Sequence, residues 1–547
     1  MNRCTFLRRA CIASLLFLAG TMVFAIGSRQ QSTAGGRQTL QIGIETNAFI
    51  TDYKNNYLTR YLERLHDIDL DFYLFPSNGA DARTRASLLA ASDDLPETLW
   101  GTFIPVLVYG SDGAILPLNS YFNDPAKTPW FNRIPQADRT AILRDTRSAD
   151  GNNYSFAQYE PSTWNMTPFR YYINRSWLDK LGLQEPKTTV ELKNVLIAFR
   201  DGDPNGNGRQ DEIGVFGHFT GGYGVNVIAA LINSFIYWNP SQLALDSTGN
   251  NVIAPFTQSA FRTALQYLND LFRERLLDAS TFTTDQQTYR AVLNTQPMVV
   301  GLTSAGSIGH FSDANNNPNF LAMAPIMAPL SSPISPGYTP YNEYTASQIS
   351  FITNKARNVD LAVKVMDSFY EPDLSIIARA GEEGVDWTRD PAIVSRYTNA
   401  YVQLGLYPAL TRITIRDQWT GPTAQHWHNT GPRYSPLSQT DTGGDMANPY
   451  DPSVPSSQQD ALNYMYYIPR RPQYILPQLS YNADDGITLS TVTTNMYQYV
   501  MLSIAEFTVG ARDINSDTAW NAYLRELDNM GLQQWLRIAQ ATYNRQR

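Results

Sequence analysis

The feature that most limits the fold is an alternation of strand-like and helix-like segments near the start of the chain. Residues 39–46 (TLQIGIET) alternate apolar and polar side chains as a strand does, and residues 69–75 (DLDFYLF) read as a second strand. Residues 55–66 carry apolar side chains at helical spacing, and residues 81–91 read as another helix. Strands that alternate with helices predict an α/β sheet with crossover connections.

The later chain adds helix signals and one irregular segment. Thr188 and Glu191 form a capping box, and Asn358 is placed to cap another helix. Two amphipathic helices, separated at Gly531, are predicted at the C-terminus. Residues 421–459 are rich in Gly, Pro, Ser, Thr and Asn and carry little periodicity, and irregular stretches this long are often functional. We interpret this segment as a surface insertion in preference to a ligand-contacting loop.

The N-terminus has the pattern of a secretory signal peptide. Three arginines precede an apolar stretch at residues 10–25, and Val23 and Ala25 fit the small-residue rule for cleavage after Ala25. The stretch is short for a membrane span, which needs roughly 20 apolar residues. We therefore expect residues 1–25 to be removed and residues 26–38 to form a flexible leader.

Cysteine usage and charge narrow the setting of the mature protein. Cys4 and Cys11 both lie in the signal peptide, so no lipobox cysteine remains to carry a lipid. That favours a soluble protein in a periplasm, with release into the medium as the alternative. The formal net charge of −8 argues against nucleic-acid binding, which needs clustered Lys and Arg. A chain of 547 residues is too long for one ordinary core and predicts two or more domains.

The loop at residues 203–212 carries the sharpest chemical signal. Oxygen-bearing side chains occupy its positions 1, 3 and 5, and Gly208 at position 6 permits a tight turn around a hard cation. An acidic pair must close the shell, because position 12 is Gly214. The predicted calcium ligands are Asp203, Asn205, Asn207, the Arg209 carbonyl, Asp211 and Glu212. We interpret the site as structural, and the alternative is a turn that binds no metal.

Several segments together resemble a known family. Residues 171–212 (YYINRSWLDKLGLQEPKTTVELKNVLIAFRDGDPNGNGRQDE) resemble the large extracellular solute-binding proteins of ABC importers, in the branch that includes alginate-oligosaccharide-binding and LipO-type proteins. Residues 88–101 (LLAASDDLPETLWG), 113–122 (GAILPLNSYF) and 507–545 agree with further segments of that family. Residues 421–459 match none of its segments.

The resemblance implies a fold and a function. The fold would be a two-lobed periplasmic-binding-protein fold, class II-like, with a hinge of two or three crossings and additional C-terminal helices. Lobe 1 would comprise residues 39–165 and 328–380, and lobe 2 residues 166–327 and 381–547, including the calcium loop and the 421–459 insertion. The protein, expected to be a monomer, would capture an oligosaccharide or another polyhydroxylated solute between the lobes. It would deliver that solute to the permease subunits of an ABC transporter.

Candidate ligand-binding residues follow from the predicted hinge crossings near residues 159–172, 327–344 and 381–387. Ligands of such proteins bind between domains and at strand ends, where an aromatic ring can stack on a sugar and polar groups can pair with hydroxyls. The alternative for each aromatic residue is a core position. The candidates are Asn47, Trp100, Tyr159, Trp164, Tyr341, Glu343, Tyr344 and Trp387, with Glu45, Tyr223 and Trp238 as weaker ones.

A secreted carbohydrate-active enzyme is the main alternative function. Glycoside hydrolysis needs two carboxylates about 5 to 9.5 Å apart across the bond. The adjacent acidic pairs in the sequence are Asp93/Asp94, Glu382/Glu383 and Asp484/Asp485, whose side chains tend to point apart. The sequence contains neither G-x-S-x-G nor H-E-x-x-H. His426-x-His428 could bind zinc but has no evident third ligand.

Overall fold

The protein is described by a computed structural model. The described residues are 36–47, 50–77, 79–148, 150–160, 166–240, 243–312, 319–328, 337–341, 346–392, 411–412, 423–428, 430–435 and 463–547. The predicted signal peptide, and the predicted leader up to residue 35, lie outside them. No helix in the described part of the chain combines the length and apolarity that a membrane crossing requires.

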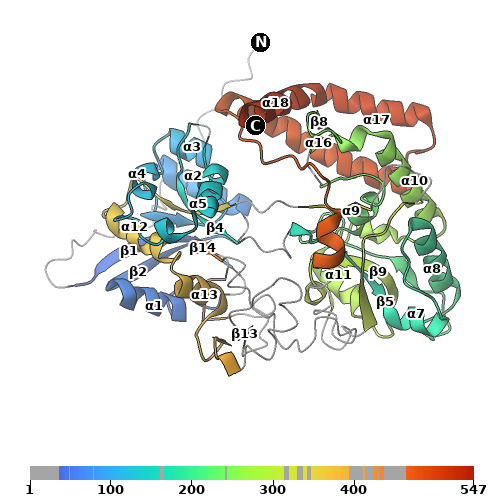
Figure 1. Cartoon of the computed structure of the whole chain (residues 1–547), viewed down its shortest axis with the longest axis horizontal. Coiled ribbons are helices and arrows are strands. Elements are labelled where there is room, and N and C mark those ends of the chain that lie inside the picture. The colour runs from blue at the N-terminus through green and yellow to red at the C-terminus, as the bar shows by residue number, and fades with distance from the viewer. Residues whose placement is uncertain are drawn as a thin grey trace, which may run out of the picture. The chain divides into compact units, whose positions relative to one another are not determined.

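The first lobe is built on a six-stranded sheet with the order β14-β4-β11-β3-β1-β2. Its strands are β1 (Gln38–Glu45), β2 (Ile68–Phe75), β3 (Thr98–Trp100), β4 (Ser155–Tyr159), β11 (Ser347–Ile352) and β14 (Arg433–Tyr434). β1 and β3 run parallel, whereas β11 runs antiparallel to both β3 and β4. Figure 1 draws blue and gold segments together in this lobe, which is therefore assembled from distant parts of the chain.

Helices cover both faces of the first sheet. They are α1 (Tyr57–His66), α2 (Gly79–Ala91), α3 (Val106–Ser111), α4 (Asn119–Phe122), α5 (Gln136–Asp145), α12 (Val359–Ser368) and α13 (Pro372–Ala380). Leu99 enters the core cluster that contains α2, and its neighbour Trp100 enters the cluster that contains α1, α12 and α13. Successive residues of a strand point to opposite faces, so the sheet is buried on both sides. A short pair, β12 (Trp387–Thr388) and β13 (Thr411–Arg412), lies outside the sheet.

The second lobe is built on a four-stranded sheet with the order β10-β5-β9-β6. Its strands are β5 (Arg170–Asn174), β6 (Ile213–Val215), β9 (Val300–Ala305) and β10 (Phe320–Met323), with a separate pair, β7 (Ala244–Leu245) and β8 (Val252–Ile253). Its helices are α7 (Arg175–Leu181), α8 (Thr189–Asp201), α9 (Val227–Ile232), α10 (Ser259–Arg273), α11 (Gln286–Leu293), α16 (Ala483–Val509), α17 (Asp517–Asn529) and α18 (Leu532–Gln546). Tyr172 and Ile173 enter two different core clusters, so this sheet is also buried on both faces.

Local sequence signals place many of these elements correctly. The Thr188 hydroxyl accepts the backbone N–H of Glu191 at the start of α8, and the Asn358 side chain accepts that of Leu361 at the start of α12. The two C-terminal helices are confirmed as α17 and α18. The sequence analysis missed α16, the 27-residue helix before them. Its buried residues Leu489 and Met496 lie seven positions apart, as one helical face requires.

The α/β class and the two-lobed organisation with added C-terminal helices are confirmed. One predicted boundary is wrong. Residues from 381 onward were expected in the second lobe, but the described residues up to 435 pack with the first lobe. Trp387 and Trp427 pack in the first-lobe core, and Arg433–Tyr434 pairs with β4. The second-lobe elements resume in the segment that begins at residue 463, where Tyr467 donates its hydroxyl to the Met323 carbonyl.

Candidate ligand-binding site

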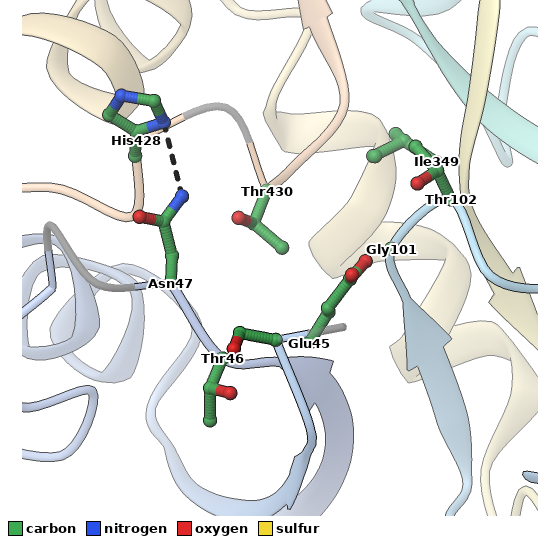
Figure 2. A pocket seen from close by; sticks show the side chains of 9 residues that line it. Glu45, Thr46, Asn47, Gly101, Thr102, Ile349, His428 and Thr430 are labelled. Carbon is green, nitrogen blue, oxygen red and sulfur yellow. Dashed lines mark hydrogen bonds between the residues drawn. The ribbon is translucent and has the colours of Figure 1, made fainter. Parts of the chain in front are cut away.

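A pocket lies at the carboxyl ends of the parallel strands of the first lobe. β1 ends at Glu45 and β3 at Trp100, and the residues that follow these strands turn around a cavity of about 420 Å³ (Figure 2). Open α/β sheets commonly bind ligands at this edge, because the chain leaves the strands there and exposes its polar groups. The pocket is lined by Glu45, Thr46, Asn47, Ser77, Gly101, Thr102, Ile349, His428 and Thr430.

Glu45 brings a half-buried carboxylate to this pocket. Its side chain is directed at Gly101 (Figure 2), where a Cβ atom would lie 2.9 Å from Glu45 Oε2. The same Cβ would lie 2.7 Å from the Phe103 ring, and the φ of +145° at Gly101 also favours glycine. Burial raises the pKa of Glu45, and a hydrogen bond from the Thr102 backbone amide offsets part of that shift.

Asn47 and His428 form a polar pair on the opposite wall. Asn47 Nδ2 lies 3.3 Å from His428 Nδ1 (Figure 2), and an amide N–H can only donate, so Nδ1 accepts. Burial, with smaller contributions from Arg379 and Arg433, lowers the pKa of His428 to about 4. The imidazole is therefore neutral near pH 7 and carries its proton on Nε2. Because Nε2 is buried, His428 acts on the pocket by holding the Asn47 side chain in place.

The segment that carries His428 is anchored in the first-lobe core. Trp427 is 1% exposed and lies edge-on to Trp100, with ring centroids 5.7 Å apart. Its Nε1 donates to Thr59 Oγ1 over 2.9 Å, and Asn56 donates to the His426 carbonyl. The interpretation of residues 421–459 as a surface insertion is thus wrong for residues 423–428 and 430–435. The overlooked signal was a tryptophan between two histidines in an otherwise polar segment.

A buried ion triad lies next to this segment. Glu160, directly after β4, accepts hydrogen bonds from Arg379 of α13 and Arg433 of β14. Burial raises the pKa of Glu160, but the two guanidinium groups outweigh burial and hold it below its usual value. The triad fastens β4, α13 and β14 together beside the pocket that His428 lines.

The second lobe has a pocket of its own, with a volume of about 280 Å³. Tyr223 lines it with a side chain that is 40% exposed, and its backbone adopts a left-handed φ of 51°. A Cβ atom on Gly306 would lie 2.5 Å from the Tyr223 ring, so the ring lies flat on this glycine. Unusual backbone of this kind is concentrated at functional sites. The lining residues are Pro168, Phe169, Phe219, Thr220, Gly221, Gly222, Tyr223, Gly224, Asn226, Asn239, Pro240 and Tyr497.

The predicted ligand residues divide into three groups. Glu45 and Asn47 meet in the first pocket, and Tyr223 lies in the second. Trp164, Glu343 and Tyr344 lie outside the described residues. The others are largely or fully buried: Trp100, Trp238 and Trp387 are at most 1% exposed, and Tyr159 and Tyr341 are 8% and 6% exposed.

The three buried tryptophans must be corrected to core residues. The Trp238 indole packs against Phe261 at 5.4 Å, and Trp387 Nε1 donates to the Gly381 carbonyl at 2.9 Å. Trp100 Nε1 donates to Thr98 Oγ1 at 2.9 Å. Large apolar rings gain most by leaving water entirely once such a bond is available, so these indoles are not available to stack on a sugar here.

The possible zinc site at His426 and His428 is not supported. The two rings lie 6.4 Å apart, and the backbone N–H of His428 donates to His426 Nδ1 over 3.0 Å. That nitrogen is therefore occupied by a hydrogen bond. Across the described ranges, no group of three or more His, Cys, Asp and Glu side chains is arranged to hold a metal.

The loop at residues 203–212 folds around its own polar side chains. Asp203 accepts backbone N–H groups of Gly206, Asn207 and Gly208 over 3.0 to 3.1 Å. Asp211 accepts the side-chain amide of Asn207 at 2.9 and 3.0 Å. The acidic and amide side chains that the sequence selected are thus gathered within one turn that follows α8.

Glu212 is the buried carboxylate of this loop, whereas Asp203 and Asp211 are only partly buried. Both of its carboxylate oxygens are buried and form no hydrogen bond with the described residues. Burial raises the pKa of Glu212, the nearby amides of Asn205 and Glu212 offset this in part, and the charges of Asp203 and Asp211 raise it further. A buried carboxylate without a partner is costly unless a cation balances it. Oxygen donors of this kind suit a hard cation such as calcium, although Asp203, Asp211 and Glu212 are not drawn together as a metal cluster in the described structure.

Comparison with known proteins places the chain in a clear group, although no family model matches it. The fructooligosaccharide ABC transporter substrate-binding protein FusA of Streptococcus pneumoniae is 25% identical over 514 residues, or 90% of this chain and 87% of FusA. Lipoprotein LipO of Bacillus subtilis is 26% identical over 166 residues, 30% of each protein. The chain is thus similar over nearly its whole length to a substrate-binding protein of an ABC transporter.

Solved structures with similar folds are also solute-binding proteins. An HMO-binding solute-binding protein from Bifidobacterium longum infantis superposes with a TM-score of 0.75 at 20% identity, covering 93% of this chain and 99% of the other. An EF-hand mutant of FusA in complex with fructo-nystose superposes with a TM-score of 0.74 at 21% identity, covering 93% and 99%. These superpositions establish the two-lobed fold. Sequence identity this low does not identify the ligand.

Proposed function

We propose that this protein is an extracytoplasmic solute-binding protein that captures an oligosaccharide and delivers it to an ABC importer. The observation that carries the proposal is the similarity to FusA over nearly the whole of both chains. The polar pocket at the strand ends of the first lobe and the aromatic pocket of the second lobe supply the two kinds of surface that sugars need.

Each lobe would bind the ligand in its own way. In the first lobe, Glu45 and Asn47 would exchange hydrogen bonds with hydroxyl groups, and His428 would hold the Asn47 side chain in place. In the second lobe, the exposed Tyr223 ring would stack on the apolar face of a sugar ring. A ligand that contacts both lobes favours a closed arrangement, because only differential affinity shifts a conformational equilibrium. Hinge crossings near residues 159–172 and 327–344 would permit this motion.

Export and delivery complete the proposed role. The N-terminal pattern supports cleavage near Ala25 and export to a periplasm. The permease subunits of an ABC transporter would receive the loaded protein. The protein itself would perform no chemistry on the sugar, because its relatives are binding proteins.

We also propose that the loop at residues 203–212 holds a structural calcium ion. Asp203, Asn205, Asn207, the Arg209 carbonyl, Asp211 and Glu212 would be its ligands. The buried, unbonded carboxylate of Glu212 supports this assignment, because a cation would supply the missing partner. The existence of an EF-hand mutant of the homologous FusA is consistent with such a loop in the family.

Titration calorimetry against a panel of oligosaccharides, followed by analysis of the sugars recovered, tests the proposed function. We expect saturable binding and recovery of the intact ligand. Tyr223→Ala should weaken binding at least about tenfold, because a stacking platform in the second lobe is lost. Tyr466→Ala is the matched control, since Tyr466 is also exposed and lies outside both pockets. Release of shorter sugars would instead establish an enzyme, and exclusive binding of peptides would refute the substrate class.

A further inference from the structure

The charged side chains that line the two pockets indicate whether the ligand is charged or neutral. Among the described lining residues of the first pocket, Glu45 is the only one that is charged near pH 7, because burial keeps His428 neutral. The residues that line the second pocket are all uncharged. Neither lining includes Lys or Arg, the side chains with which proteins recognise carboxylates.

The nearest guanidinium groups are committed elsewhere. Arg379 and Arg433 influence His428, but both donate to the buried Glu160 carboxylate, and neither lines the pocket. The described residues also place no Lys or Arg in ion-pair contact with Glu45, whose carboxylate is held against Gly101. Within the described part of the chain, no cationic side chain neutralises the negative charge at the pocket wall.

A ligand carboxylate in this pocket would face two costs. It would lose its hydration without gaining a cationic partner, and it would be repelled by Glu45 in a half-buried, weakly screened environment. A neutral sugar faces neither cost. Its hydroxyl groups can donate to Glu45, and charge-assisted hydrogen bonds of this kind are stronger than neutral ones.

We propose that the ligand of this protein is an uncharged oligosaccharide and that Glu45 excludes sugars bearing carboxylates, such as uronic acids, from the first-lobe pocket. This inference rests on the proposed sugar-binding function and adds the substrate class. It makes Glu45 a specificity-determining residue that accepts hydrogen bonds from the hydroxyl groups of a neutral sugar and repels a uronate.

Calorimetric titrations with neutral and uronate oligosaccharides of equal length test the proposal. The probes are fructo-, gluco- and manno-oligosaccharides on one side and oligogalacturonate and oligoalginate on the other. We expect at least one neutral probe to bind the wild-type protein at least about tenfold more tightly than any uronate, which corresponds to about 1.4 kcal/mol. Glu45→Gln should reduce the ratio of the uronate Kd to the neutral-sugar Kd at least about threefold, because the repulsion is removed while the side-chain shape is kept.

Two further variants make the result specific. Glu526→Gln, in α17 of the second lobe, removes a carboxylate outside both pockets and should leave the ratio unchanged. Ser77→Arg adds a cation at the exposed rim of the first pocket without altering Glu45, and it should strengthen uronate binding. This second test remains valid if Glu45→Gln does not fold.

The outcomes separate this inference from the proposed function. Uronates that bind the wild-type protein as tightly as neutral sugars would overturn the inference and leave sugar binding intact. An unchanged ratio in both Glu45→Gln and Ser77→Arg would also overturn the assignment to Glu45. Failure of every oligosaccharide to bind would overturn the proposed function, and the inference with it.

Discussion

Several buried ionisable side chains of this protein differ in how their charge is balanced. Glu97 is held by Arg357 over 2.8 Å, so its pKa falls below the usual value in spite of burial. No described Lys or Arg side chain is in such contact with Glu45 or Glu212, and burial raises the pKa of both. The balanced carboxylate stabilises the fold, whereas the unbalanced pair marks the proposed sugar and calcium sites.

At the scale of one residue, His66 is expected to make the stability of the fold depend on pH. It ends α1, and its Nε2 lies 3.0 Å from Ser368 Oγ. Burial, and then Lys364, lower its pKa to about 4 from a usual 6.5. Between pH 4 and pH 6.5, His66 is therefore protonated in the unfolded chain and neutral in the folded chain. The stabilising contribution is complete above pH 6.5 and is lost as the pH falls toward 4.

The loss can be measured by urea unfolding at pH 7.5 and pH 5. Since one pKa unit corresponds to about 1.4 kcal/mol, His66 should account for up to about 2 kcal/mol of the stability difference, less if solvent reaches the ring. His66→Gln should remove that part of the pH dependence. His218→Gln should retain it, because His66 is intact. Equal pH dependence in the wild type and His66→Gln would refute the assignment.

At the scale of elements, Trp427 anchors the described residues 423–428 in the core of the first lobe. Its ring contacts Phe72, Trp100 and Phe369, with centroids 5.4, 5.7 and 6.1 Å away. His428 and Thr430 follow directly on the same segment and line the first pocket. Packing of one residue in the core therefore fixes the position of two candidate ligand residues.

Truncation of this anchor should affect both stability and binding. Trp427→Ala should lower the free energy of unfolding by about 3 to 5 kcal/mol, as for other fully buried aromatic residues, and should weaken sugar binding in the molecules that remain folded. Trp130→Ala is the control, because Trp130 is only partly buried and lies over Arg133 in the same lobe. Chemical denaturation and calorimetry provide the two readouts. Full sugar affinity in Trp427→Ala would show that the segment does not form the site.

At the scale of the whole molecule, the two sheets have separate hydrophobic cores. The clusters around the first sheet contain no residue of the second, and α16, α17 and α18 belong to the second-lobe core. The calcium loop follows α8 in that second lobe. Loss of the ion should therefore destabilise the second lobe and leave the Glu45 pocket in place.

Thermal unfolding with and without a chelator tests this expectation. A ligand that binds only the folded state at a hundredfold excess over its Kd contributes about 2.7 kcal/mol, so chelation should lower Tm and added calcium should restore it. Asp203→Ala should have a low Tm that chelation does not change. Asp246→Ala removes another hydrogen-bonded turn of the same lobe and should stay sensitive to chelation. An unchanged Tm with no copurified metal would mean that the loop is only a turn. Loss of sugar binding without loss of stability would place the ion in the ligand site.

The sequence by itself determined the features that depend on local spacing. The strands β1 and β2, the caps of α8 and α12, the C-terminal helices and the gathering of Asp203 and Asp211 all follow from neighbours within a few residues. The resemblance of motifs supplied the two-lobed fold.

Only the tertiary structure decided which side chains reach a pocket. Trp100 and Glu45 both end parallel strands, yet the indole faces the core and the carboxylate faces the cavity. The hydrogen bond between Asn47 and His428 joins residues 381 positions apart, and no local sequence pattern predicts such a contact. Burial of an aromatic ring depends on partners that arrive from distant segments, as Trp427 does for Trp100. Periodicity thus predicts a residue's element and face, whereas its exposure to a ligand depends on how the elements pack.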